Sequence, residues 1–126
     1  MSIFITLISC LCISFGNEYI KVSDPKTASD AQDYCHTIYG TSLATIMNAN
    51  DNAKASIVCA GECLIGLNDI NNEGTFKNFD GTAGLYTNWI IGWNNNDGED
   101  CVEIVSSSSR MDTVPCNDSL PFLCNA

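Results

Sequence analysis

The spacing of hydrophobic positions changes along this chain, and each change marks an expected element. Apolar side chains recur three to four residues apart through residues 27–39, which predicts an amphipathic helix. Thr27 or Ser29 can cap its first turn, and Gly40 can end it. The expected buried positions of this helix are Ala28, Ala31, Cys35 and Ile38.

A second helix is expected over residues 49–58, because Asn48 or Asn50 can cap its start. The other apolar runs are short, and short runs bounded by turn residues predict strands. These runs cover residues 18–22, 43–46, 63–67, 101–105, 111–116 and 121–124, with a turn at 106–109. Two helices and several strands without a repeating βαβ order predict an α+β domain.

Residues 68–100 follow neither a helical nor a strand period. They are rich in Asn, Gly and Asp, with aromatic residues between them. A connection of this length without regular structure is uncommon inside a compact domain and is usually functional. We therefore expect ligand chemistry in this segment.

Residues 3–15 form an apolar run that is too short to span a membrane, which takes about 20 residues. The small residues Ser14 and Gly16 follow the pattern of a cleavage site. This predicts a signal peptide at 1–16, a single domain at 17–126 and a secreted protein. The alternatives are a buried N-terminal element and an uncleaved anchor.

The composition restricts the class of partner. The chain has 126 residues, a formal net charge of −10 and 45% hydrophobic residues, which is typical of one folded acidic domain. Nucleic acid and anionic membrane surfaces are excluded as partners, because both require a basic face.

Eight cysteines are a high number for this length, and six of them lie after the expected signal peptide. An even number in a secreted chain predicts disulfides, although the spacing leaves their connectivity open. Zinc is the alternative, but Cys59 and Cys63 form a single pair and His36 is the one histidine.

The long polar segment carries oxygen ligands of the kind that calcium prefers. These are Asp69, Glu73, Asn95, Asn96, Asp97, Glu99 and Asp100. A solvated acidic loop is the alternative interpretation. We expect no enzymatic activity, because Ser106–Ser109 lacks a nucleophile motif and His36 has no partner nucleophile in sequence.

Several short motifs, taken in order, resemble the C-type lectin domain over nearly all of residues 17–126. They include Ala31-Gln-Asp-Tyr-Cys35, Ser42-Leu-Ala-Thr-Ile46, Leu64-Ile-Gly-Leu67, Gly98-Glu-Asp-Cys101, Val114-Pro-Cys116 and Pro121-Phe-Leu-Cys124. The resemblance implies two helices with small antiparallel sheets, a long calcium- and ligand-binding loop, and stabilising disulfides.

The resemblance also implies a disulfide pairing. It joins Cys35 to Cys124 and Cys101 to Cys116. Cys59 and Cys63 are then left to bond to each other or, alternatively, to another chain.

By position, five residues resemble the auxiliary calcium site of the family: Asp69, Glu73, Asn96, Glu99 and Asp100. The sugar-binding calcium site is matched less well, because its first triplet falls on Trp93-Asn94-Asn95 and lacks the family's proline. Asn95, Glu99 and Asp112 remain as ligands there. One calcium site is therefore expected rather than two.

Trp93 can stack on the apolar face of a sugar ring or pack on the domain itself, and Trp89 is expected in the core. The expected ligand-binding residues are Trp93, Asn95, Glu99 and Asp112. The resemblance implies a secreted protein that binds a glycan or glycoprotein with the help of calcium. The alternative is a lectin-like domain that binds a protein or another non-sugar ligand, with calcium structural or absent.

Overall fold

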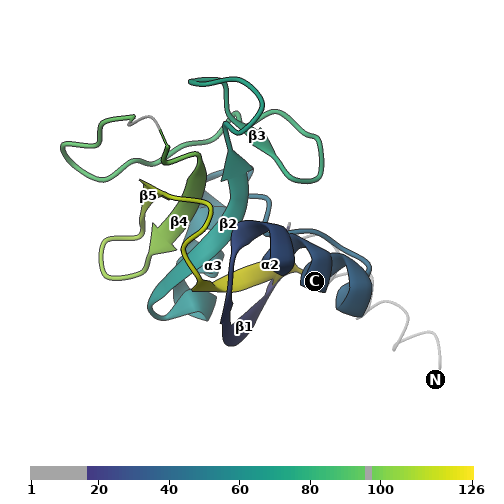
Figure 1. Ribbon diagram of the computed structural model, residues 1–126. Helices are drawn as coiled ribbons and strands as arrows, with labels where there is room; N and C mark the ends of the chain where they lie inside the picture. The colour runs from purple at the N-terminus through teal and green to yellow at the C-terminus, as the bar shows by residue number, and fades with distance from the viewer. Residues whose placement is uncertain (1–16, 96–97) are drawn as a thin grey trace.

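The computed structural model describes residues 17–95 and 98–126, so the expected signal peptide and Asn96 lie outside the described residues. Helices flank both faces of one sheet (Figure 1). The elements are β1 (Tyr19–Lys26), α2 (Ala28–Tyr34), η1 (Cys35–Tyr39), α3 (Ala49–Cys59), β2 (Glu62–Asn68), β3 (Lys77–Asn78), β4 (Cys101–Val105), β5 (Arg110–Val114) and β6 (Leu120–Asn125).

The strands form one six-stranded sheet in the order β1-β6-β2-β4-β5, with β3 paired to β2. All pairings are antiparallel except that of β2 with β6, which meet at Leu64 and Phe122. The α+β prediction is confirmed. The expected small sheets are parts of one mixed sheet, because β2 pairs with strands on both of its sides.

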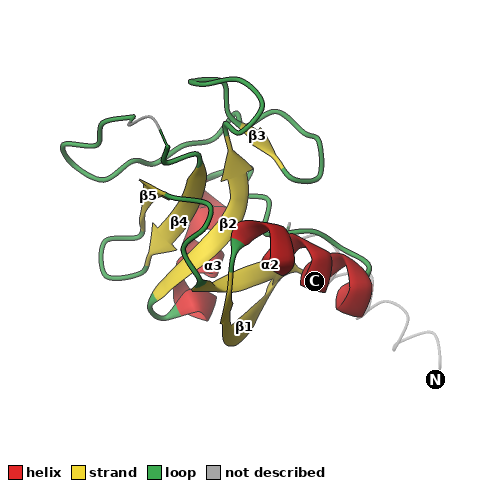
Figure 2. Cartoon of the chain, in the orientation of Figure 1, coloured by secondary structure: helices red, strands yellow, loops and turns green. Residues whose placement is uncertain are grey.

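The sheet is buried on both faces. On one face, α3 packs on a core that contains Ile65 and Ile104, and on the other face α2 packs over Leu64 and Phe122. Figure 2 shows the two helices on either side of the strands. This explains why β2 reads as a continuous apolar run rather than an alternating one, since successive side chains on a strand point to opposite faces.

The first helix begins and ends where expected, but its second half is not α-helical. The Thr27 side chain caps its start by accepting from the Asp30 N–H, and Gly40 ends it with φ 69°. Residues Cys35–Tyr39 form a π-helix. The wider turn moves Ile38 off the buried face, so its predicted burial is wrong and its side chain is 56% exposed.

The strand expected at 43–46 is a buried extended segment with a single β-bridge, from Leu43 to Cys124. It lies between β2 and β6, because the Ala44 N–H donates to the Leu123 carbonyl and the Ala44 carbonyl accepts from the Gly66 N–H. A side chain at Gly66 would come within 2.8 Å of the Leu43 oxygen, so only glycine fits there.

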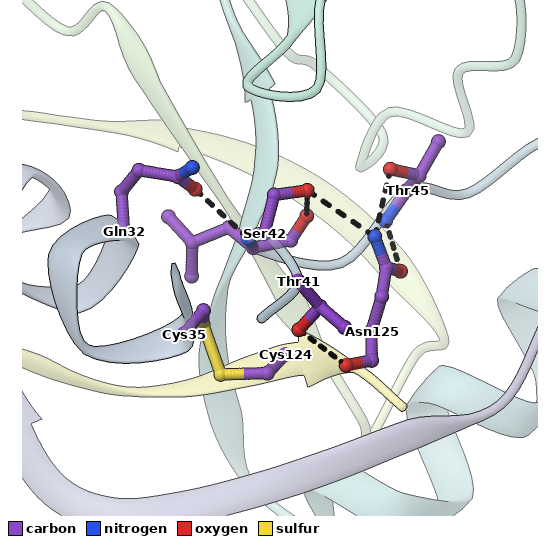
Figure 3. The surroundings of a disulfide bond; sticks show 8 residues. Gln32, Cys35, Thr41, Ser42, Thr45, Cys124 and Asn125 are labelled. Carbon is purple, nitrogen blue, oxygen red and sulfur yellow. Dashed lines mark hydrogen bonds between the residues drawn. A yellow bond between two sulfur atoms is a disulfide. The ribbon is translucent and has the colours of Figure 1, made fainter. Parts of the chain in front are cut away.

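Side chains continue this connection where the backbone ladder stops (Figure 3). The Asn125 amide accepts from the Thr45 N–H at 3.0 Å and donates to the hydroxyls of Ser42 and Thr45. Thr41 donates to the Asn125 carbonyl at 2.6 Å. The segment after the first helix is therefore fixed to the last strand.

Three disulfides stabilise the part of the chain that the structure describes. Two are the pairs that the resemblance implied, and the third joins Cys59 to Cys63, which was one of the two alternatives left open. Cys35 is bonded to Cys124, Cys59 to Cys63, and Cys101 to Cys116. The first joins the helical segment to β6, and the second joins the end of α3 to β2. Within residues 17–95 and 98–126, no helix is both long and apolar enough to cross a membrane.

Candidate functional site

The long polar segment connects the end of β2 to the start of β4 and contains only one short strand, β3 (Figure 1). Because β2 and β4 are antiparallel neighbours, with Asn68 opposite Cys101, the two ends of the loop meet. The Asp69 N–H donates to the Asp100 carbonyl at 3.0 Å. The sheet thus places two carboxylates side by side that are 31 positions apart in the chain.

Three carboxylates meet at this point and form the acidic cluster: Asp69, Glu73 and Asp100. One oxygen of each lies within 4.8 Å of the others. Asp69 is 2% exposed, whereas Glu73 lies on the surface. The Asp69 Oδ2 accepts from the Gly74 N–H at 2.8 Å, and this bond turns the chain so that Glu73 faces back towards Asp69.

Asn95 adds an amide to the acidic cluster. Its Nδ2 donates to Glu73 at 3.1 Å and to Asp69 at 3.4 Å. The Asp69 Oδ1 and the Asn95 Oδ1 are both buried, and neither has a hydrogen-bond partner among the described residues. Leaving a buried oxygen unpaired costs roughly 1–3 kcal/mol, more when it is charged.

These residues fit a calcium ion. Calcium binds carboxylate and amide oxygens, and two such oxygens are buried here without a donor. Three carboxylates this close repel one another unless a cation or protons intervene. The residues that would hold the ion are Asp69, Glu73, Asn95 and Asp100.

The other expected ligand-binding residues do not join the acidic cluster. Trp93 stacks on Trp89, with ring centroids 4.1 Å apart and planes 5° from parallel, and Phe76 packs against both rings. One face of Trp93 is therefore covered by protein. Trp89, expected in the core, is partly buried at the core's edge.

Glu99 faces β5. The Trp93 indole N–H donates to the Thr113 hydroxyl at 3.3 Å, and that hydroxyl donates to the Glu99 Oε1 at 3.3 Å. The motifs of the long segment do not indicate Thr113, which lies on β5. The signal was strand alternation, since Thr113 shares a face with the buried Met111.

Asp112 lies on the opposite face of β5 from Thr113, because neighbouring strand residues alternate. There it is paired across the sheet with Glu103. Burial first, and then the negative charges of Glu62, Asp112 and Asp118, together raise the pKa of Glu103 to about 7. The expected site shared by Asp112, Asn95 and Glu99 stays a prediction.

A family model described as the Lectin C-type domain matches residues 24–126. Among curated proteins, Collectin-11 of Bos taurus is 38% identical over 112 residues. That match covers 84% of this chain and 42% of Collectin-11, so the chain spans less than half the length of that relative.

Solved structures share the fold. The carbohydrate-recognition domain of cow CD23, determined in the presence of a GlcNAc2Man3 oligosaccharide, has a TM-score of 0.77 and 24% identity, covering 86% of this chain and 85% of that one. A Ca²⁺-dependent type II antifreeze protein in its Ca²⁺-free form has a TM-score of 0.80 and 22% identity, covering 88% and 92%.

Proposed function

This chain belongs to the C-type lectin domain family, and from that premise we propose that it is a secreted, calcium-assisted carbohydrate-binding protein. Its role is binding rather than catalysis. The ligand is a glycan or glycoprotein held at the long loop, and one calcium ion is bound at Asp69, Glu73, Asn95 and Asp100.

The observation that supports this proposal most is the pair of buried oxygens without donors, Asp69 Oδ1 and Asn95 Oδ1. Both oxygens lie in the connection from β2 to β4, which contains little regular structure. A ligand bound to them would therefore order that loop. Calcium would supply a positive charge among the carboxylates and hold the two halves of the loop together. Asn96 adjoins this set in sequence and stays a predicted ligand.

Sugar recognition would use the residues next to the ion. Glu99 and Asn95 come from the same stretch of loop and carry acceptors and donors for sugar hydroxyls. The tryptophan stack of Trp89 and Trp93 offers an aromatic surface beside them. Asp112 is not part of this proposed surface, because it faces Glu103 across the sheet.

The full chain is expressed in a secretory host. The secreted protein is then tested for binding on a glycan array, first with millimolar calcium and then with chelator. We expect the protein to bind a defined set of glycans in calcium and to lose that binding in chelator. Trp93→Ala should weaken that binding, and Tyr39→Ala, an exposed aromatic on η1, is the matched control. Calcium-dependent stabilisation without any glycan bound would reject the sugar proposal and retain the calcium site.

A protein or another non-sugar ligand is the second candidate. It is favoured by one observation: Asn95 donates to Glu73, Glu99 accepts from Thr113, and Asp112 is the cross-strand partner of Glu103, so these three predicted sugar ligands have different neighbours. The antifreeze protein has the same fold. Chelator-resistant binding to a protein, with no glycan retained, would favour this candidate.

A further inference from the structure

The turn between β5 and β6 contains the sequence Asn117-Asp118-Ser119. This is an acceptor sequence for N-linked glycosylation, in which a Ser or Thr follows the Asn two positions later and the middle residue is not proline. It occurs once in the chain. The proposed ligand site makes no use of it.

The structure places this acceptor on the outside of the turn. Asn117, Asp118 and Ser119 are all exposed, while the chain on either side is fixed. The Asp118 N–H donates to the Pro115 carbonyl at 3.1 Å, and Cys116 is held by its disulfide to Cys101. The motif is thus presented on a rigid support, with all three of its residues at the surface.

There is open space beside the acceptor side chain. Asn117 borders a cavity of about 290 Å³ that it shares with residues of α2 and of the long loop, among them Gln32, Ile70 and Phe79. A substituent on the exposed Asn117 amide has this space and the solvent available to it. Ile70 is 48% exposed there and would gain cover from the first sugar.

We propose that Asn117 carries an N-linked glycan. This inference rests on the secreted location proposed above, because the modification takes place in the secretory pathway. A bond forms between the Asn117 Nδ2 and the anomeric carbon of the incoming oligosaccharide, whose donor is a polyprenyl-pyrophosphate-linked oligosaccharide. The bond from that carbon to the pyrophosphate oxygen breaks, the lipid pyrophosphate leaves, and the amide nitrogen loses one proton.

The glycan and the proposed ligand site are separate features. Asn117 lies on the β5–β6 turn, and the acidic cluster lies on the β2–β4 loop.

The full chain is expressed in a eukaryotic secretory host, and intact mass is measured before and after an enzyme that removes N-linked glycans. The expected result is a heavier secreted protein whose mass falls on treatment, with Asn117 converted to Asp in the released peptide. Asn117→Gln and Ser119→Ala should abolish the extra mass. Ser119→Thr should keep it because the acceptor sequence is intact, and Ser107→Ala, at an exposed serine on the β4–β5 turn, is the control.

A secreted wild-type chain of unmodified mass would overturn the glycosylation inference and leave secretion standing. A chain that never enters the secretory pathway would overturn both. Extra mass that persists in Asn117→Gln would overturn the assignment to this residue.

Discussion

Asp69 is the residue on which the proposed calcium site depends most. It is the most buried member of the acidic cluster, and its two oxygens have different roles. The Oδ2 holds the turn through the Gly74 N–H, whereas the Oδ1 is buried with no donor. A carboxylate placed in this way is costly unless a cation compensates for it.

Asp69→Asn should therefore abolish most of the stabilisation by calcium. Binding to the native state alone contributes about 2.7 kcal/mol when free calcium is ~100 times its dissociation constant. Thermal unfolding is followed with calcium and with chelator, and the wild type should shift upward by several degrees. Asp33→Asn, an exposed acid on α2, should keep the full shift. An equal shift in all three proteins would place calcium elsewhere.

Thr113 tests whether Glu99 belongs to the calcium site. Thr113 is 3% exposed and joins the Trp93 indole to the Glu99 carboxylate. Thr113→Val keeps the shape but removes the hydroxyl, so it should cost about 1–3 kcal/mol by leaving the indole N–H unpaired. Urea unfolding in chelator measures that loss.

We expect the calcium response of Thr113→Val to equal that of the wild type, because Thr113 contributes no ligand to the acidic cluster of Asp69, Glu73 and Asp100. A reduced calcium shift would show instead that Glu99 is a ligand of the ion, as the family resemblance implied. Unfolding in chelator and the calcium shift together thus show whether Glu99 binds the ion or serves only as the partner of Thr113.

At the scale of elements, helix caps and apolar runs were predictable from sequence and deviations inside elements were not. Thr27, Asn48 and Gly40 cap or end helices through local geometry, which adjacent residues determine. The π-helical turn at Cys35–Tyr39 was not predictable in this way, because helical spacing assumes one period throughout. Ile38 was consequently assigned to the wrong face.

In the candidate site, too, some residues could be placed from sequence and others could not. The family resemblance placed Asp69 and Asp100 together, and in the structure they meet because each adjoins a strand of the same sheet. The role of Asp112 stays a prediction, because its side of β5 depends on register and a shift of one residue exchanges the two faces of a strand. The burial of Met111 fixes that register, and it is a tertiary property.

Because β4 pairs with β5, Glu103 lies opposite Asp112, and we expect the stability of the domain to depend on pH. Glu103 is 7% exposed, and its Oε1 has no hydrogen-bond partner among the described residues. Burial and the neighbouring acids raise the pKa of Glu103 to about 7 from an ordinary value near 4.5. The folded state therefore holds this proton more tightly than the unfolded state does.

Stability contributed by this proton is fully present below about pH 4.5 and is lost as the pH rises through about 7. Glu103→Gln should flatten that fall and be more stable than the wild type at pH 8. The unfolding free energy is measured in chelator from pH 5 to 8, so that calcium binding does not contribute. A fall of equal size in the variant would assign the pH dependence to other groups.

At the scale of the whole molecule, the two ends of the domain lie together and away from the long loop. β1 pairs with β6, and the Ala126 N–H donates to the Glu18 carbonyl at 2.9 Å. In Figure 1 the long loop lies above the sheet, while the C-terminus lies beside α2. The loop is held at its base by the Asp69–Asp100 backbone bond and further along by the backbone bonds of Asn88 and Ile90 with Met111. The disulfides add to the stability of the fold.

The two helix-linked disulfides offer a matched test of that stability. Cys35–Cys124 closes a long loop with a sequence separation of 89, and Cys59–Cys63 closes a short one with a separation of 4. All four cysteines are fully buried, so replacement by alanine leaves similar cavities in both cases. The difference between the two losses then reports mainly how much each bond restricts the unfolded chain.

A cross-link restricts the unfolded state more as its loop lengthens, in proportion to the logarithm of loop length. The ratio of the two loops corresponds to about 2.5 kcal/mol at 25 °C. Removing Cys35 and Cys124 together should therefore destabilise the domain by about that much more than removing Cys59 and Cys63. Guanidinium unfolding of the two double alanine variants, both in saturating calcium, measures the difference. Equal losses would mean that local packing at each bond, rather than chain closure, determines its contribution.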